Sequence, residues 1–196
     1  MQATFAFVMF FVAGSSSFTY RDFRHGFNTS IEEFYNTTEP IWTYQTIVAS
    51  TIGISCLVDV TANTSLSNIY FDRFFYSNGS RIKQSLRGTL YKDRAGKSWE
   101  TLIYDHGTLL DREQLFYQSD DNSCGVFTFF QHPDILRFDL RLRNCSLQMG
   151  PHKNCSSYFN EYYKHNWLSR LHRKWTKQML YKPECQNIFN PPDACK

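Results

Sequence analysis

Charged side chains alternate with apolar ones between residues 134 and 143 of this 196-residue chain. Arg137, Asp139 and Arg141 share one face of an extended segment there, because successive side chains of a strand point to opposite sides. A guanidinium facing an apolar cavity can bind both oxygens of a carboxylate. The pattern indicates a site for an organic acid if this face lines a cavity. The alternative is a solvated face, with the apolar residues filling the interior, and charged strand faces are more often solvated.

Catalytic arrangements are absent from the sequence. None of the six histidines belongs to a His-Glu-x-x-His zinc motif, and there is no Gly-x-Ser-x-Gly nucleophile elbow. The pair Asp120-Asp121 is typical of a turn rather than of a catalytic dyad. We predict that the protein is not an enzyme and needs no metal ion or other cofactor.

Cysteines and glycosylation sequons indicate the secretory pathway, because disulfides persist in oxidising compartments and sequons are used on exported proteins. The six sequons begin at Asn28, Asn36, Asn63, Asn78, Asn144 and Asn154. The six cysteines are Cys56, Cys124, Cys145, Cys155, Cys185 and Cys195. Six cysteines can pair in many ways, and their spacing alone leaves the pairing open.

The N-terminus predicts a signal peptide over residues 1–17, followed by one domain over 18–196. An uncharged apolar run leads into small residues at 14–17. That run is shorter than the roughly 20 residues that cross a bilayer, and no later run of that length lacks charge. We therefore expect a secreted, extracellular protein with no membrane span.

Short aromatic and β-branched runs separated by turn residues predict an antiparallel barrel or sandwich. The expected strands are 41–48, 53–61, 66–76, 81–92, 98–105, 112–119, 124–131 and 134–143. A helix is expected over 21–35, with Ser30 capping its last part. Helical spacing returns at Tyr158 and Phe159, and Trp175 and Leu180 are expected to extend or restart that helix.

Three strings carry a resemblance to a known family. They are Glu39-Pro40-Ile41-Trp42, Ser119-Asp120-Asp121-Asn122-Ser123-Cys124 and Phe159-Asn160-Glu161-Tyr162. With the cysteine positions, they resemble the tick salivary lipocalins, the family that includes the histamine-binding proteins. The resemblance covers about residues 30 to 185. It implies an all-β fold, an eight-stranded up-and-down barrel with a short N-terminal and a C-terminal helix, which can hold one small ligand.

The resemblance also implies a disulfide pattern. It pairs Cys56 with Cys185 and Cys124 with Cys155, which leaves Cys145 for Cys195. A bridged middle residue crowds a glycan acceptor, which speaks against glycosylation at the two cysteine-centred sequons, Asn144 and Asn154.

The ligand implied by the resemblance depends on two short motifs. Relatives that bind histamine or serotonin carry Cys-Asp-aliphatic and, later, Glu-Leu-Trp or Glu-Leu-Tyr, which supply carboxylates for an ammonium group. This chain has Cys124-Gly125-Val126 and Asp139-Leu140-Arg141 instead. If Asp139 keeps the inward register of the family's Glu, the neighbouring arginines also point inward. We therefore expect a lipid acid, such as a leukotriene or fatty acid, with a biogenic amine as the alternative.

Further ligand contacts are expected from position, each with a simpler alternative. Trp42 either contacts ligand or packs on the barrel floor, and Glu39 either faces the ligand at the barrel mouth or is a surface carboxylate. Tyr70 and Phe74 share one strand face and either line the pocket or fill it.

The basic segment between His152 and Lys182 offers a competing function. Four cations lie there around Trp167 and Trp175, namely Arg170, Arg173, Lys174 and Lys177. They could bind a host protein or a heparin-like glycan, or form a solvated helix face. We expect a monomer with a small host mediator as its partner and no nucleic-acid partner.

Overall fold

A computed structural model describes residues 29–48, 52–92, 98–131, 134–165 and 175–189. The predicted signal peptide and Asn28 lie outside these ranges. The elements in chain order are α1 (Ile31–Tyr35), β1 (Ile41–Val48), β2 (Ile54–Thr64), β3 (Asn68–Ser77), β4 (Ser80–Lys92), β5 (Ser98–Asp105), β6 (Thr108–Gln118), β7 (Cys124–Gln131), β8 (Asp134–Arg143), the 3-10 turn η1 (Asn144–Ser146), α2 (Lys153–His165), β9 (Thr176–Met179) and the 3-10 segment η3 (Pro183–Ile188).

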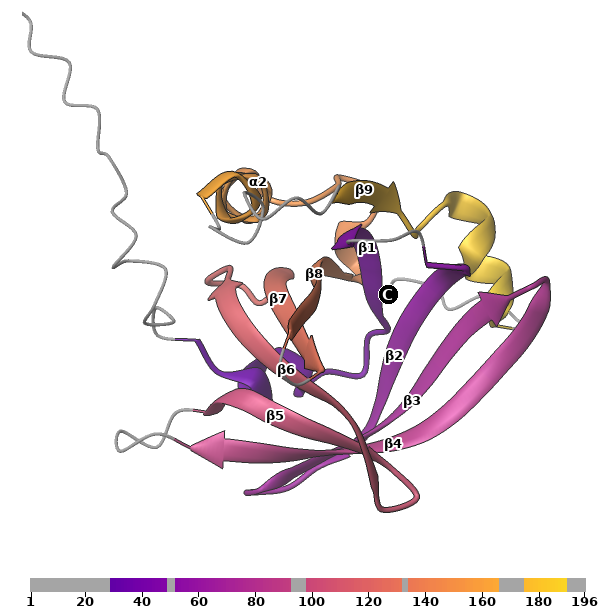
Figure 1. The fold of residues 1–196 in the computed structure, drawn as a ribbon, viewed down its shortest axis with the longest axis vertical. Helices are drawn as coiled ribbons and strands as arrows, with labels where there is room; N and C mark the ends of the chain where they lie inside the picture. The colour runs from indigo at the N-terminus through magenta and orange to yellow at the C-terminus, as the bar shows by residue number, and fades with distance from the viewer. Residues whose placement is uncertain (1–28, 49–51, 93–97, 132–133, 166–174, 190–196) are drawn as a thin grey trace, which may run out of the picture.

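The first eight strands form a closed antiparallel barrel (Figure 1). Each strand from β2 to β8 pairs with its neighbours in the chain, and β1 closes the ring by pairing with both β8 and β2. Tight turns join β3 to β4 and β5 to β6, and the residues at Asn78-Gly79 and His106-Gly107 have the positive φ angles that such hairpin tips require. The predicted barrel is confirmed, with strand bounds close to those expected.

Strand β1 divides its edge between two partners. Ile41 and Trp42 pair with β2, whereas the stretch from Gln45 to Val48 pairs with β9. The predicted extension of the C-terminal helix to Leu180 is therefore wrong at residues 176–179. Barrel closure leaves half of the β1 edge without a partner, and the pairing with β9 satisfies those backbone groups.

Helix α1 closes one end of the barrel. The Ser30 hydroxyl accepts a hydrogen bond from the backbone N–H of Glu33, which confirms the predicted cap. The helix buries Ile31, Phe34 and Tyr35 among side chains of the inner wall. Nearby strand ends include the C-terminal end of β6. The β5–β6 turn and the adjoining ends of β7 and β8 at Gln131 and Asp134 therefore lie at the opposite end, which α1 does not cover and which we call the open end.

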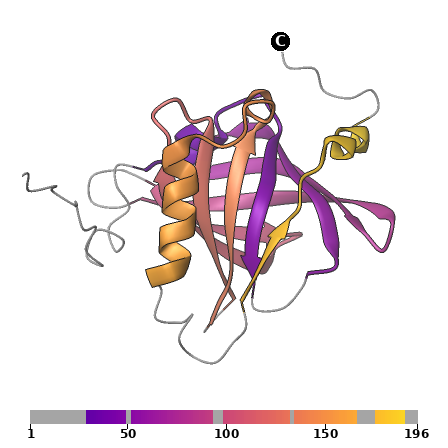
Figure 2. The ribbon, with the colours of Figure 1, turned by 90° about the horizontal axis from the view of Figure 1, so that it is seen from above.

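Part of the outer wall is covered by elements that follow β8 (Figure 2). Helix α2 buries Phe159 and Cys155 against the outward faces of β7 and β8. Segment η3 places Ile188 against Val58 and Phe74 on the outer side of β2 and β3. Strands β8 and β3 are thus apolar on a face that does not line the barrel interior.

Two predicted disulfides are confirmed, Cys56–Cys185 and Cys124–Cys155. They join η3 to β2 and α2 to β7, so both hold outer elements to the barrel wall. Cys195, the predicted partner of Cys145, lies outside the described residues. Within the described ranges, no helix is long and apolar enough to cross a membrane.

Candidate functional site

The charged face of β8 points into the barrel. Asp139 and Arg141 are almost completely buried, and their neighbours Phe138, Leu140 and Leu142 pack outward beneath α2. The interpretation of this strand as a solvated face with a leucine-filled interior is therefore wrong. Both faces of β8 are buried, because a helix covers the outside of the barrel at this strand.

Two arginines and two carboxylates form an ion network across the interior. Arg73 donates to both carboxylate oxygens of Asp59, at 2.7 and 2.9 Å, and to Glu113 at 2.9 Å. Arg141 donates to both oxygens of Glu113, at 3.0 and 3.2 Å. The four residues come from β2, β3, β6 and β8, so the network joins opposite walls of the barrel. Forked contacts of this kind fix side-chain orientation as well as charge.

Helix α1 contributes Tyr35 to the same network. The Tyr35 hydroxyl donates to Asp59 at 3.1 Å and accepts from Arg141. Burial raises the pKa of this phenol well above its ordinary value, although Arg141 opposes the shift. Tyr35 therefore stays neutral, and it hydrogen-bonds to Asp59 and Arg141 without adding a charge to the network.

The two network carboxylates remain ionised. Burial disfavours their charged forms, but Arg73 beside Asp59 and Arg141 beside Glu113 outweigh it and lower the pKa of both groups. Since each folded-state pKa lies below its unfolded value, the network contributes stability above the unfolded pKa. That contribution is lost as pH falls through the folded-state values.

A second set of charged side chains, beginning with Asp139 and Arg137, lies beside the network on the side of the open end. The carboxylate of Asp139 accepts from the Thr46 hydroxyl at 2.7 Å and lies 3.3 Å from Nε of Arg137. The Arg137 guanidinium stacks on the Phe129 ring, 3.7 Å from its centroid. Its Nε and Nη2 atoms are buried without a hydrogen-bond partner.

Asp111 completes this group from the wall of β6. It is the register partner of the buried Ile103 and shares the inward face of Glu113, nearer the open end. Burial raises the pKa of Asp111, and Arg137 only partly offsets that effect. Asp111 makes no hydrogen bond or ion pair with other described residues. We call the seven inward side chains the inner charge cluster: Asp59, Arg73, Asp111, Glu113, Arg137, Asp139 and Arg141.

The other predicted contacts lie away from this cluster. Trp42 is fully buried on the outer side, where it packs on Tyr181 and Phe189, so its predicted places on the barrel floor or against ligand are wrong. Glu39 accepts from the backbone N–H of Cys145 at 2.9 Å, at the end closed by α1.

Tyr70 and Phe74 share one face of β3, as predicted, but that face points outward. Phe74 packs against Phe189 of the C-terminal segment, and Tyr70 is 41% exposed. Neither side chain lines the barrel interior, so the prediction of an inward face is wrong.

Sequence reasoning missed Asp59, Arg73, Glu113 and Asp111. A signal was available, since Arg73 shares its strand face with Ile69 and Phe71, and Glu113 shares its face with Leu115. A lone charge on an apolar strand face must find a partner when that face is buried. Such a charge predicts a partner on another strand, although it does not predict which one.

Gly125 is the position at which the sequence resemblance to amine-binding lipocalins implied an aspartate, and the structure leaves no room for a side chain there. A Cβ atom at this inward position would lie 2.9 Å from Cε2 of Phe34 and 3.1 Å from Cδ1 of Leu115. The ring from α1 occupies the space that a carboxylate would need.

Replacing Gly125 with aspartate should displace α1. We expect a loss of about 1–3 kcal/mol in unfolding free energy from overpacking, and more if the carboxylate stays buried. Chemical denaturation would measure the loss. A companion Phe34→Ala change should relieve the crowding, and an unchanged loss in that background would contradict the assigned contact.

The structure describes five of the six sequon asparagines and part of the basic segment. Asn36, Asn63, Asn78 and Asn154 are exposed. Asn144 is 6% exposed and accepts through Oδ1 from Trp42 and Gln186, which does not suit a glycan acceptor. Of the four basic-segment cations only Lys177 is described, and it donates to Asn160.

Comparisons with known proteins identify the fold. No family model matches the chain, and no curated protein matches its sequence. Among solved structures, the match to AM182 in its serotonin complex spans 82% of this chain and 95% of the AM182 chain, with a TM-score of 0.57 and 14% sequence identity. The match to the siderocalin Ex-FABP spans 74% of this chain and 93% of the Ex-FABP chain, with a TM-score of 0.53 and 9% sequence identity. The protein therefore has the lipocalin fold, a closed eight-stranded up-and-down antiparallel barrel.

Proposed function

We propose that the protein is a secreted salivary lipocalin that holds a small host mediator in its barrel, and that this mediator is an organic cation such as a protonated amine. The observation that carries the proposal is Asp111. The inner charge cluster contains four carboxylates and only three guanidiniums, and Asp111 is the carboxylate without a close partner. A half-buried carboxylate in this position stabilises an incoming ammonium group.

The charge balance reverses the preference for a lipid acid. Both Arg73 and Arg141 already pair with internal carboxylates, which balance their charge and, among their buried nitrogen atoms, leave only Nε of Arg141 without a hydrogen-bond partner in the described part of the chain. Phe127 and Phe129 of the inner wall already stack on guanidiniums, so the ring surfaces of this wall favour positive charge. The proposal also agrees with the serotonin complex of the similar barrel AM182.

A lipid acid is the second candidate, and it rests on Arg137. This guanidinium has two buried nitrogen atoms without hydrogen-bond partners, which a carboxylate could satisfy. The two candidates differ in the effect expected at Asp111. An anion would bind more tightly once that neighbouring carboxylate is neutralised, whereas a cation would bind more weakly.

Replacing Asp111 with asparagine tests the proposal. We expect histamine or serotonin to bind the wild-type protein and to lose affinity by about 30-fold in the variant, because an ammonium loses its unpaired carboxylate. The variant should also be more stable by about 1 kcal/mol, since a half-buried charge without a close partner has been removed. Isothermal titration calorimetry and denaturation would measure the two effects.

The pH dependence supplies a second readout. The pKa of Asp111 is raised in the free protein, and a bound cation would lower it, so binding releases a proton. Amine affinity should therefore rise with pH through that raised pKa. Asp120→Asn, at an exposed turn, is the matched control and should change nothing. Tighter binding of arachidonate by Asp111→Asn, with no amine binding by either form, would favour the lipid acid.

A further inference from the structure

An outward-facing row of side chains crosses four strands of the barrel wall. Asn63 is the register partner of Tyr70, Tyr70 of Arg87, and Arg87 of Tyr104. Register partners in an antiparallel sheet project on the same side and lie side by side. Three strand spacings separate the ends of the row, which is about 14 Å. A glycosylation acceptor thus begins a continuous row of two aromatic rings and a guanidinium.

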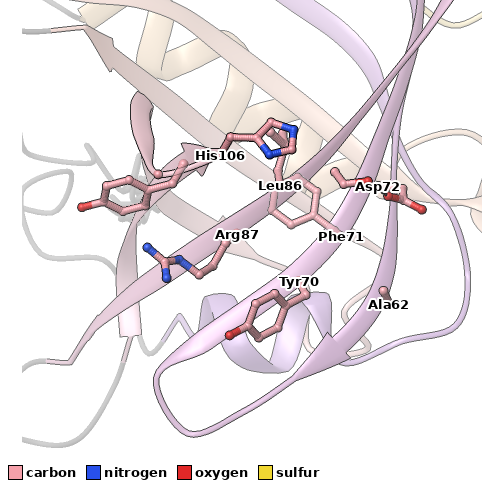
Figure 3. Close-up of a pocket in the computed structure, with 10 residues that line it drawn as sticks. Ala62, Tyr70, Phe71, Asp72, Leu86, Arg87 and His106 are labelled. Atoms are coloured by element: carbon pink, nitrogen blue, oxygen red, sulfur yellow. Dashed lines mark hydrogen bonds between the residues drawn. The ribbon is translucent and has the colours of Figure 1, made fainter.

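The row borders a surface pocket of about 330 Å³ (Figure 3). Tyr70, Arg87 and Tyr104 line it, and so does Ala62, the residue immediately before the acceptor. The Arg87 guanidinium lies over the Tyr104 ring, 5.1 Å from its centroid. Asp72, also in the lining, is already held by Lys83 and Ser85. The pocket therefore offers the Tyr70 ring, which no other described side chain contacts, and the Arg87 guanidinium, which donates no hydrogen bond to a described residue.

We propose that the N-linked glycan of Asn63 lies along this row, with its proximal sugars seated in the pocket. Sugars present C–H faces that pack on tyrosine rings and hydroxyl and acetamido groups that accept hydrogen bonds from arginine. Covalent attachment beside Ala62 gives the glycan an effective concentration that a free saccharide cannot match. The inference is independent of the ligand in the barrel interior.

The experiment uses the full chain secreted from insect cells, with Asn78 as the matched site. Asn78 is exposed at the tip of the β3–β4 turn. Site-resolved mass spectrometry should find Asn63 occupied. Under native conditions, an amidase that cleaves N-glycans should release the Asn63 glycan about fivefold more slowly than the Asn78 glycan, because sugar–ring contacts must first open.

Tyr70→Ala should bring the Asn63 release rate to that of Asn78, while leaving the Asn78 rate unchanged. Asn63→Gln should lower the Tm by about 2–4 °C in the wild-type background and have no effect in the Tyr70→Ala background. Arg87→Gln provides a second variant on an exposed side chain. An unoccupied Asn63, equal release rates at the two sites, or a rate unaffected by both variants would overturn the proposal.

Discussion

Glu113→Gln should lower the free energy of unfolding by about 3–5 kcal/mol, the usual cost of removing one partner from a buried ion network. Glu113 accepts from Arg73 and, through both oxygens, from Arg141, and its side chain is fully buried. The amide would leave Arg73 and Arg141 with Asp59 between them, and with Asp139 at 3.7 Å from Arg141 as the next carboxylate. Urea denaturation followed by circular dichroism would measure the loss.

The same variant should alter the response to acid. Glu113 contributes stability that is lost as pH falls through its lowered pKa, and the amide has no proton to gain. The difference in stability between wild type and variant should therefore shrink at low pH. Glu184→Gln, on an exposed side chain of η3, should stay within about 0.5 kcal/mol of wild type. A similarly small change for Glu113→Gln would show that the network does not stabilise the fold.

Removing the Cys56–Cys185 bridge by a double serine replacement should cost about 3–5 kcal/mol. The cysteines are 129 residues apart, and cross-linking so long a loop greatly restricts the unfolded chain. The loss should appear as a lower denaturation midpoint in the oxidised protein.

The second bridge provides the comparison. Cys124 and Cys155 are only 31 residues apart, so removing them should cost about 1 kcal/mol less in the chain-entropy account. Equal losses would indicate that the folded state, rather than loop length, determines the contribution of each bridge. Loss of α2 packing only in the variant without the Cys124–Cys155 bridge would also indicate that the folded state determines the contribution. Near-ultraviolet circular dichroism of the α2 tyrosines would detect that loss.

The barrel could be predicted from the sequence because its signals are local. Strand alternation, turns such as Asn78-Gly79 and the Ser30 cap each depend on a few consecutive residues, and all agree with the structure. Strand β9 was missed because its pairing depends on how β1 divides its edge, a feature that arises only when the barrel closes. The alternation of β8 predicted two distinct faces but could not reveal that a helix buries the outer one.

The interior was harder to predict, because its contacts join residues distant in the chain. Arg141 was identified as an inward candidate, but its partner Glu113 lies on β6, and Tyr35, which contacts both residues, belongs to α1. Trp42 and Phe74 were predicted from their strand positions either to contact ligand or to pack inside the barrel, but a large apolar residue on a strand suits an outer core equally well. Which core they join depends on whether a segment such as η3 covers the outer wall.

Both described disulfides attach outer elements to the wall, and neither crosses the interior. Selection for a new ligand acts on inward side chains, and such changes commonly reduce stability. A barrel held together from outside can accumulate those changes while its cross-links keep it folded. The lining of this protein can therefore diverge between related genes while the cysteines remain in place, so the positions of Cys56, Cys124, Cys155 and Cys185 should identify its relatives better than the residues that contact the ligand.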